Sequence, residues 1–352
     1  SAKQEAWTFG SPSVLMMFHL QIRNLDAELT AMNECMPHYY RITQGHGQGA
    51  ELLMNAEAAF MQGNFSDAQI LLEQTYSTIA SNGQHNISLC CDFLAARLSL
   101  FQEGVTFVKN PEVKRKELLS LHNMMWLNIF DSTYAYYYAL IRMPEKIPAL
   151  FKDHMLSTVS FLSPCRPMME MIENQVFLSQ KMYAKVIGRS ETLLPFCEKM
   201  HYELVSLHVQ IQTASAYAML GKHHDARQLL QKALGHAMPD GFLIPFVENY
   251  NYIKDVLGSI NSITPEPFTD RILSLGSVYE QHCLRLSSRN YRPEILNMLN
   301  SREAEIAALI TDRLSNREIA ERLFLSEGTV KQYVNQIYSK LMINGDTRTK
   351  RK

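Results

Sequence analysis

A helix, a glycine turn and a second helix recur in this sequence, and this pattern constrains the fold more than any other feature. Residues 59–68 place Ala59, Gly63, Phe65 and Ala68 at a spacing that residues 218–226 approximately repeat. Glycine adopts the left-handed conformation that ends many helices, and a small alanine lets the next helix approach closely. A weaker copy, without glycine, runs through Gln180–Tyr183. The sequence therefore predicts helical hairpins.

Helical periodicity extends over most of the chain, whereas strand-like alternation is scarce. The first helices of six hairpins are expected near Ala50, Asn86, Asn128, Met168, His201 and Ile244, at intervals of 33 to 43 residues. Their average of about 39 residues falls between the tetratricopeptide repeat and longer helical repeats, and the turn pattern resembles the tetratricopeptide one. We therefore predict an all-α fold in which residues 1–285 form a tetratricopeptide-like helical-hairpin solenoid with a concave face.

Composition excludes several other classes of protein. Apolar residues make up 46% and charged residues 20%, which is typical of a globular chain, and 15 Gly with 13 Pro are few for an all-β fold. The six cysteines form no Cys-x-x-Cys pair, so we expect free thiols in a reducing cytoplasm. No apolar run approaches the ~18 residues of a membrane span. Because the chain starts at Ser1, we expect the natural protein to extend upstream.

A second unit is expected at the C-terminal end. The polar, turn-prone stretch from Leu286 to Pro293 predicts a linker over residues 286–297, followed by a domain over residues 298–352. Ser301 and Ser315 are suitable N-caps for two helices, and a third helix is expected from about Gly328 to Leu341.

The third of these helices has two unlike faces. At 100° per residue, one face of the helix carries the apolar side chains of Val330, Val334, Ile337 and Leu341. The opposite face carries the polar side chains of Gln332, Asn335 and Ser339, and Lys331 and Gln336 flank it. Side-chain amides read adenine edges in the major groove, and Lys and Arg bind phosphates. Residues 331–352 carry six Lys and Arg against one Asp, although the whole chain has a formal net charge of −1. The pattern favours contact with DNA.

The C-terminal sequence resembles the LuxR-type helix-turn-helix family. The resemblance rests on Leu-Asn-Ser-Arg-Glu-x-Glu-Ile from Leu299, on Ser-Asn-Arg-Glu-Ile-Ala-Glu-Arg-Leu-x-Leu-Ser-Glu-Gly-Thr-Val-Lys from Ser315, and on Ile-x-x-Lys-Leu from Ile337. It implies that Glu318–Leu323 is the scaffold helix and Thr329–Leu341 the recognition helix.

The same resemblance implies the residues that contact DNA. Base contacts are expected from Lys331, Gln332 and Asn335, and phosphate contacts from Ser315, Asn316, Ser326, Thr329, Tyr333, Lys340 and Arg348. Tyr333 stands where the family usually has His. The family's fourth helix, commonly its dimer contact, would follow Thr349, close to the last residue here. We therefore expect any homodimer to pair through the solenoid.

The stretch from Pro239 to Phe246 resembles the junction between sensor and DNA-binding domain in MalT-like regulators. In those proteins a nucleotide-binding ATPase module precedes a tetratricopeptide-like sensor. This chain has no Gly-x-x-x-x-Gly-Lys-Ser/Thr motif, and Gly45–Gly49 lacks the lysine. The resemblance implies the C-terminal half of such a regulator, or a version without the ATPase.

Candidate effector residues cluster on one predicted helix. Tyr134, Tyr137 and Tyr138 share a helical face, and with Trp126, Arg142 and Arg166 they would form an aromatic groove with anion anchors. The alternative is packing between helices. His223-His224-Asp225 has no further ligand at a convincing spacing, so we predict no metal and no cofactor.

These features predict a regulator of transcription and not an enzyme, because no nucleophile elbow or phosphate-binding loop occurs in the sequence. A small molecule or a protein bound by the solenoid would control the reading of double-stranded DNA. The alternative is an adaptor whose solenoid binds a partner protein, without an independent role in DNA binding.

Overall fold

The computed structural model describes residues 10–80, 83–102, 104–105, 107, 111–159, 161, 163–290, 299–311 and 314–340. Within these ranges the chain contains helices and no strand, which confirms the predicted all-α class. Contacts along the chain divide it into two units, residues 1–285 and 286–352.

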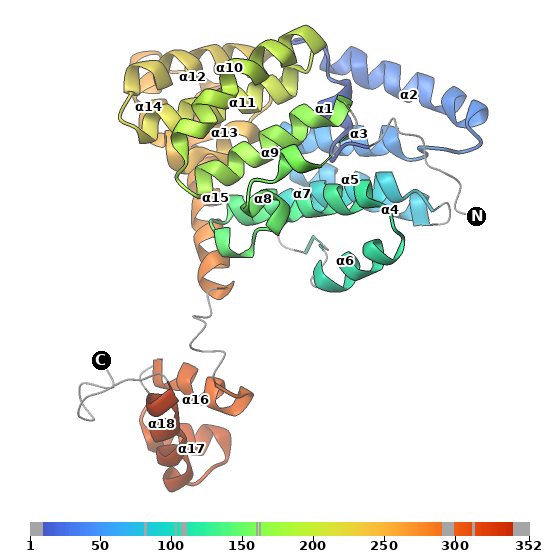
Figure 1. The fold of residues 1–352 in the computed structure, drawn as a ribbon. Coiled ribbons are helices and arrows are strands. Elements are labelled where there is room, and N and C mark those ends of the chain that lie inside the picture. The colour runs from blue at the N-terminus through green and yellow to red at the C-terminus, as the bar shows by residue number, and fades with distance from the viewer. Residues whose placement is uncertain are drawn as a thin grey trace. The chain divides into compact units, whose positions relative to one another are not determined.

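The helices of the first unit follow one another in hairpins (Figure 1). The α-helices are α1 (Val14–Phe18), α2 (Leu25–Ile42), α3 (Ala50–Met61), α4 (Phe65–Ala80), α5 (His85–Leu98), α6 (Pro111–Ser120), α7 (Met124–Leu140), α8 (Ala149–Lys152), α9 (Arg166–Ser179), α10 (Tyr183–Met200), α11 (Glu203–Met219), α12 (His223–Ala237), α13 (Ile244–Glu248), α14 (Tyr250–Ile263) and α15 (Pro267–Asn290). Short 3-10 turns are η2 (Pro144–Lys146), η3 (Leu156–Thr158), η4 (Ser163–Cys165) and η5 (Met238–Asp240). The helices α3, α5, α7, α9, α11 and α13 begin within four residues of the predicted hairpin starts.

The glycine turns have the predicted geometry. Gly63 has φ 81° and Gly221 has φ 75°, both in the left-handed region. After each glycine the next amide closes the turn, from Asn64 to the Ala59 carbonyl at 2.8 Å and from Lys222 to the Tyr217 carbonyl at 2.9 Å. In the copy without glycine, Lys181 takes the same conformation with φ 61°. The hairpin is therefore set by local sequence.

First and second helices of the hairpins differ in burial. In α5, 12 of 14 residues are buried and in α11 12 of 17, whereas α10 buries four of its 18 residues. The first helices therefore line the interior, and the second helices form the outside with one apolar stripe each.

The interior is closed by segments distant in sequence. The Leu243 amide, just before α13, donates to the Met61 carbonyl of α3 at 2.8 Å. Arg97 of α5 makes a two-pronged ion pair with Glu248 of α13, with N–O distances of 2.7 and 3.0 Å. The last helices thus return to the first hairpins, and α13 lies beside α3 (Figure 1).

The inner surface that an open solenoid presents to solvent is filled here. Residues 10–16 are all buried. The Leu15 amide donates to Glu57 Oε2 of α3 at 2.6 Å, and the Cys90 thiol of α5 donates to the Ser11 carbonyl at 2.8 Å. At α3 and α5, the concave face expected from the repeat pattern is therefore occupied by the N-terminal segment of the chain itself.

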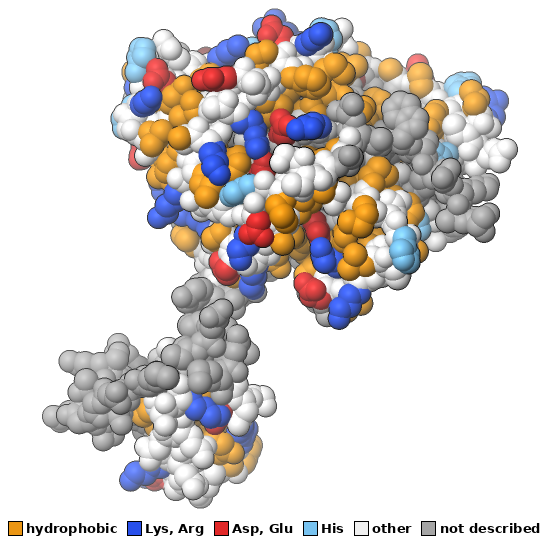
Figure 2. Space-filling model, in the orientation of Figure 1, with side chains coloured by type: hydrophobic (Ala, Val, Ile, Leu, Met, Phe, Trp, Pro, Cys, Tyr) orange, Lys and Arg blue, Asp and Glu red, His pale blue; other side chains and the backbone are white. Residues whose placement is uncertain are grey.

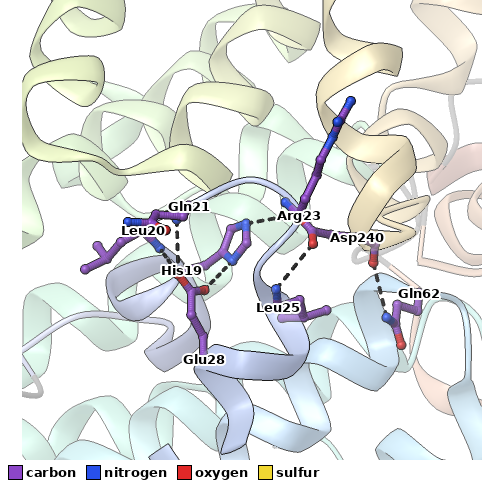
Figure 3. Close-up of polar contacts among 8 residues, drawn as sticks. All are labelled: His19, Leu20, Gln21, Arg23, Leu25, Glu28, Gln62 and Asp240. Carbon is purple, nitrogen blue, oxygen red and sulfur yellow. Dashed lines mark hydrogen bonds and ion pairs between the residues drawn. The ribbon is translucent and has the colours of Figure 1, made fainter. Parts of the chain in front are cut away.

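His19 joins this N-terminal segment to the turn that follows α12 (Figure 3). Its Nδ1 lies 2.6 Å from Glu28 Oε2 of α2, and its Nε2 lies 3.5 Å from Asp240 Oδ2 of η5. Burial alone would lower the pKa of His19, but the bonds to Asp240 and Glu28 outweigh burial and raise the pKa to about 9. His19 is therefore a buried imidazolium between two carboxylates, and we call these three residues the His19 clamp.

Helix α15 extends past the expected start of the linker. The linker was expected from Leu286, and α15 continues through Asn290. The five residues from Leu286 to Asn290 include neither Pro nor Gly, so nothing in the local sequence ends the helix there. The other expected linker residues, 291–297, lie outside the described residues.

The second unit contains α16 (Ser301–Thr311), α17 (Asn316–Leu323) and α18 (Glu327–Lys340). The three helices enclose one apolar core, formed by Leu299, Ile306, Leu309, Ile319, Ala320, Val330, Val334, Ile337 and Tyr338. In neither unit does a described helix have the length and apolar character needed to cross a membrane.

Candidate nucleic-acid interface

Capping side chains fix the beginnings of α17 and α18. The Glu318 amide donates to Ser315 Oγ at 3.3 Å, and the Ser315 amide donates to the Glu318 carboxylate at 2.7 Å, which is a reciprocal capping box. These bonds hold the pKa of Glu318 below its usual value. At α18 the Thr329 amide donates to Ser326 Oγ at 3.0 Å. The predicted phosphate contacts Ser315, Ser326 and Thr329 thus lie at two helix N-termini.

The turn between α17 and α18 is short. Phe324 ends α17 with φ 54°, and the Leu325 amide donates to the Ala320 carbonyl at 2.9 Å. This left-handed residue turns the chain sharply, so that α18 starts at Glu327. The Phe324 side chain is 96% exposed, which the sequence pattern did not predict.

Helix α18 has the two faces that its sequence predicts. Val330, Val334 and Ile337 are buried in the core as predicted, whereas Lys331, Gln332, Asn335, Gln336 and Ser339 are exposed. Tyr338 is buried as well, which was not predicted, and Leu341 lies outside the described residues. Within the described part of the chain, the side chains of Lys331, Gln332 and Asn335 have no hydrogen-bond or ion-pair partner. Their polar groups are therefore available to a ligand outside the protein.

Two of the predicted phosphate contacts take part in the domain's own packing. Lys340 Nζ lies 2.8 and 2.7 Å from the carboxylate oxygens of the buried Glu303. This pair fastens the end of α18 to the start of α16, and the Lys340 bond holds the pKa of Glu303 below its usual value. Tyr333 is half-buried against the core. Asn316 begins α17, and Arg348 lies outside the described residues.

The N-cap of α16 was expected at Ser301, but Ser301 is the first helical residue and Asn300 makes the capping bonds, with Glu303 as their partner. The Asn300 amide donates to Glu303 Oε2 at 2.7 Å and the Glu303 amide donates to Asn300 Oδ1 at 2.8 Å, so Glu303 is held at the first turn of α16. The Asn-x-x-Glu spacing was the available signal, because it is that of a capping box. The pairing of Glu303 with Lys340, 37 residues later, is a tertiary contact.

The predicted effector residues are only partly brought together. Tyr134 and Tyr138 line a pocket of about 510 Å³ between α6, α7 and α8. Trp126 is buried and donates to Asn86 Oδ1 at 2.8 Å, and Tyr137 packs on Phe107. Trp126 and Tyr137 do not line the pocket.

The expected anion anchors also lie away from this pocket. Arg142 Nη2 lies 3.8 Å from Glu280 Oε1, and Arg166 Nε lies 2.9 Å from Glu170 Oε1. The cations that do line the pocket are Arg115 and Lys146. Within the described ranges, no three His, Cys, Asp or Glu side chains are grouped so that they could hold a metal ion.

Comparison with known proteins identifies the second unit. Residues 297–350 match the family described as bacterial regulatory proteins, luxR family. The C-terminal unit is a LuxR-family helix-turn-helix domain. The match lies within this unit, and the resemblance of the solenoid to MalT-like regulators stays a prediction.

Several curated proteins are similar to parts of the chain. Transcriptional regulatory protein DegU of Brevibacillus brevis is 30% identical over 141 residues, 40% of this chain and 52% of the relative. Transcriptional regulatory protein LnrK of Bacillus subtilis (strain 168) is 44% identical over 57 residues, 16% of this chain and 26% of the relative. Transcriptional regulatory protein DesR of the same strain is 36% identical over 75 residues, 18% of this chain and 38% of the relative. The matched region of the chain thus spans about half or less of the length of each of these relatives. No solved structure matches it.

Proposed function

We propose that this chain is a DNA-binding regulator of transcription, in which the LuxR-family domain places α18 in the major groove. The observation that carries the proposal is the exposed row of Lys331, Gln332 and Asn335 on α18, opposite its buried face. The two amides can each make paired hydrogen bonds to a base edge, and the lysine can contact guanine or a phosphate. The relatives named as transcriptional regulatory proteins support the same function.

Phosphates would lie at the N-termini of α17 and α18. Unpaired backbone amides and the helix dipole make such ends favourable for anions. Ser315, Asn316, Ser326 and Thr329 stand there, so we keep these four as phosphate contacts. Lys340 is engaged with Glu303, and its part in DNA binding would require that pair to open.

The solenoid would supply the control. On the face drawn in Figure 2, acidic and basic side chains are interspersed over the first unit. That face therefore has no basic patch of the kind that binds nucleic acid. The pocket beside Tyr134 and Tyr138 could hold an effector that favours one state of the regulator over another. Pairing through the solenoid would bring two LuxR-family domains to two half-sites, and light scattering of the chain with operator DNA would test it.

The proposal is tested by selecting duplexes from a random pool with the full chain, followed by footprinting and affinity measurements at fixed salt. Asn335→Ala is expected to cost about 1–3 kcal/mol at a single base-pair position and to relax specificity there. Lys331→Ala is expected to weaken binding to all sequences, because a lysine contact with phosphate does not depend on the base sequence.

Thr311→Ala is the matched control for these two variants. Thr311 is an exposed residue at the end of α16, and its hydroxyl donates to the Ala307 carbonyl of the same helix at 2.9 Å. This substitution should leave DNA affinity unchanged. Equal losses on every sequence for Asn335→Ala and Lys331→Ala would contradict base reading by Asn335. Failure of the full chain to bind any duplex, beside capture of a partner protein by the solenoid, would favour the adaptor.

A further inference from the structure

An aromatic stripe forms one wall of the pocket in the first unit. Phe130, Tyr134 and Tyr138 follow one another at four-residue spacing along α7, with ring centroids 4.8 and 6.0 Å apart. The opposite side comes from α6 and from the segment between η2 and α8. A volume of about 510 Å³ lies in the range of sites for small organic molecules.

Four charged side chains line this pocket, and two of them neutralise each other. The Arg115 guanidinium donates to both oxygens of Asp131 at 3.0 and 3.1 Å. The other two, Glu112 on α6 and Lys146 on η2, are exposed, and their side chains form no hydrogen bond or ion pair with a described residue. The Lys146 ammonium lies 5.9 Å from the centroid of the Tyr138 ring, at the end of the aromatic stripe.

We propose that this pocket binds an amphoteric aromatic molecule, of which an aromatic amino acid is the simplest example. The aromatic ring would pack against Tyr138, the one member of the stripe that is not buried, the carboxylate would meet Lys146, and the ammonium group would meet Glu112. A ligand with one charge only would leave either Glu112 or Lys146 without a partner. The effect of such a ligand on DNA binding rests on the proposed function, whereas its binding to the pocket does not.

The test is titration calorimetry on the full chain without DNA. The probes are L-phenylalanine, L-tryptophan, 3-phenylpropionate, phenethylamine and L-leucine, of which the last three lack the ammonium group, the carboxylate and the ring in turn. The two aromatic amino acids are expected to bind, and each of the other three at least about tenfold more weakly.

Two substitutions at exposed positions test which side chain binds the carboxylate of the ligand and which binds its ammonium group. Lys146→Met is expected to weaken L-phenylalanine about tenfold and to leave phenethylamine unchanged, because the amine has no carboxylate. Glu112→Gln is expected to weaken L-phenylalanine similarly and to leave 3-phenylpropionate unchanged. Lys152→Met on α8 and Glu117→Gln on α6 are the controls, since both residues lie on helices that wall the pocket but do not line it.

No heat from either amino acid at millimolar concentration would overturn the proposal, as would equal weakening by the control variants. Tighter binding of the acid or the amine alone would refute the amphoteric assignment. A second titration adds selected duplex DNA. Ligand binding that leaves DNA affinity unchanged would keep the ligand assignment and contradict the sensor role in the proposed function.

Discussion

Replacing Glu248 by leucine is expected to lower the free energy of unfolding of the first unit by about 3–5 kcal/mol. The Arg97 and Glu248 side chains are 3% and 0% exposed, so the substitution leaves a buried guanidinium without its partner. The Tyr136 hydroxyl, which donates to Glu248 Oε2 at 2.8 Å, loses its acceptor as well. Urea unfolding of the full chain, followed by helical circular dichroism at pH 7, measures this loss.

The double variant Arg97→Met with Glu248→Leu distinguishes the contribution of the ion pair to stability from that of side-chain packing. Removing both charges is expected to recover part of the loss, because no uncompensated charge remains in the interior. Glu170→Gln is the control, since its partner Arg166 is 61% exposed and such a pair contributes about 1 kcal/mol or less. A loss for Glu248→Leu no larger than that of the control would show that the ion pair does not hold α13 in place.

His19→Gln removes the charge at the centre of the His19 clamp and is expected to destabilise the first unit by about 3 kcal/mol at about pH 6. The pKa of His19 is raised from 6.5 to about 9 in the folded chain. A group whose pKa is raised on folding contributes its full stabilisation at pH values below its pKa in the unfolded chain, which is 6.5 for this histidine. This contribution is lost as the pH rises through about 9. The wild type should therefore lose its advantage over the variant between about pH 6.5 and pH 9, as measured by urea unfolding at a series of pH values.

The difference between the two unfolding curves isolates His19 from other titrating groups. Burial raises the pKa of Glu57 to about 7 and that of Asp92 to about 6, so the titration of Glu57 overlaps the start of this pH range. Both groups are present in wild type and variant, so their effect cancels in the difference. His38→Gln is a control on the exposed surface of α2. Parallel curves for wild type and His19→Gln over this pH range would contradict a charged His19 between Glu28 and Asp240.

The helices and the reading face could be predicted because their signals are local. Gly63 and Gly221 mark turns within a few residues, and the apolar spacing along α18 fixes which side of that helix faces the core. Helix α15 runs past the expected linker start because Leu286–Asn290 contains neither Pro nor Gly. The linker was expected there from the polarity of these residues, and polarity alone does not end a helix. The arginine anchors of the effector site were placed by composition, and the structure pairs Arg142 and Arg166 with other residues.

The sequence by itself determined the all-α class and the hairpins, because a helix, its caps and its apolar face depend on residues three or four apart. The LuxR-type domain was implied by the resemblance of residues 299–349 to that family. Only the tertiary structure decided that the solenoid closes on itself. Arg97 forms its ion pair with Glu248, which lies 151 residues away in the sequence. The Asp240 carboxylate accepts a hydrogen bond from the Arg23 amide, 217 residues away. The helical periodicity of the sequence does not predict such partners, because they are brought together by the angles at which successive hairpins pack. The pocket beside Tyr134 and Tyr138 has the same origin, because its walls come from different helices.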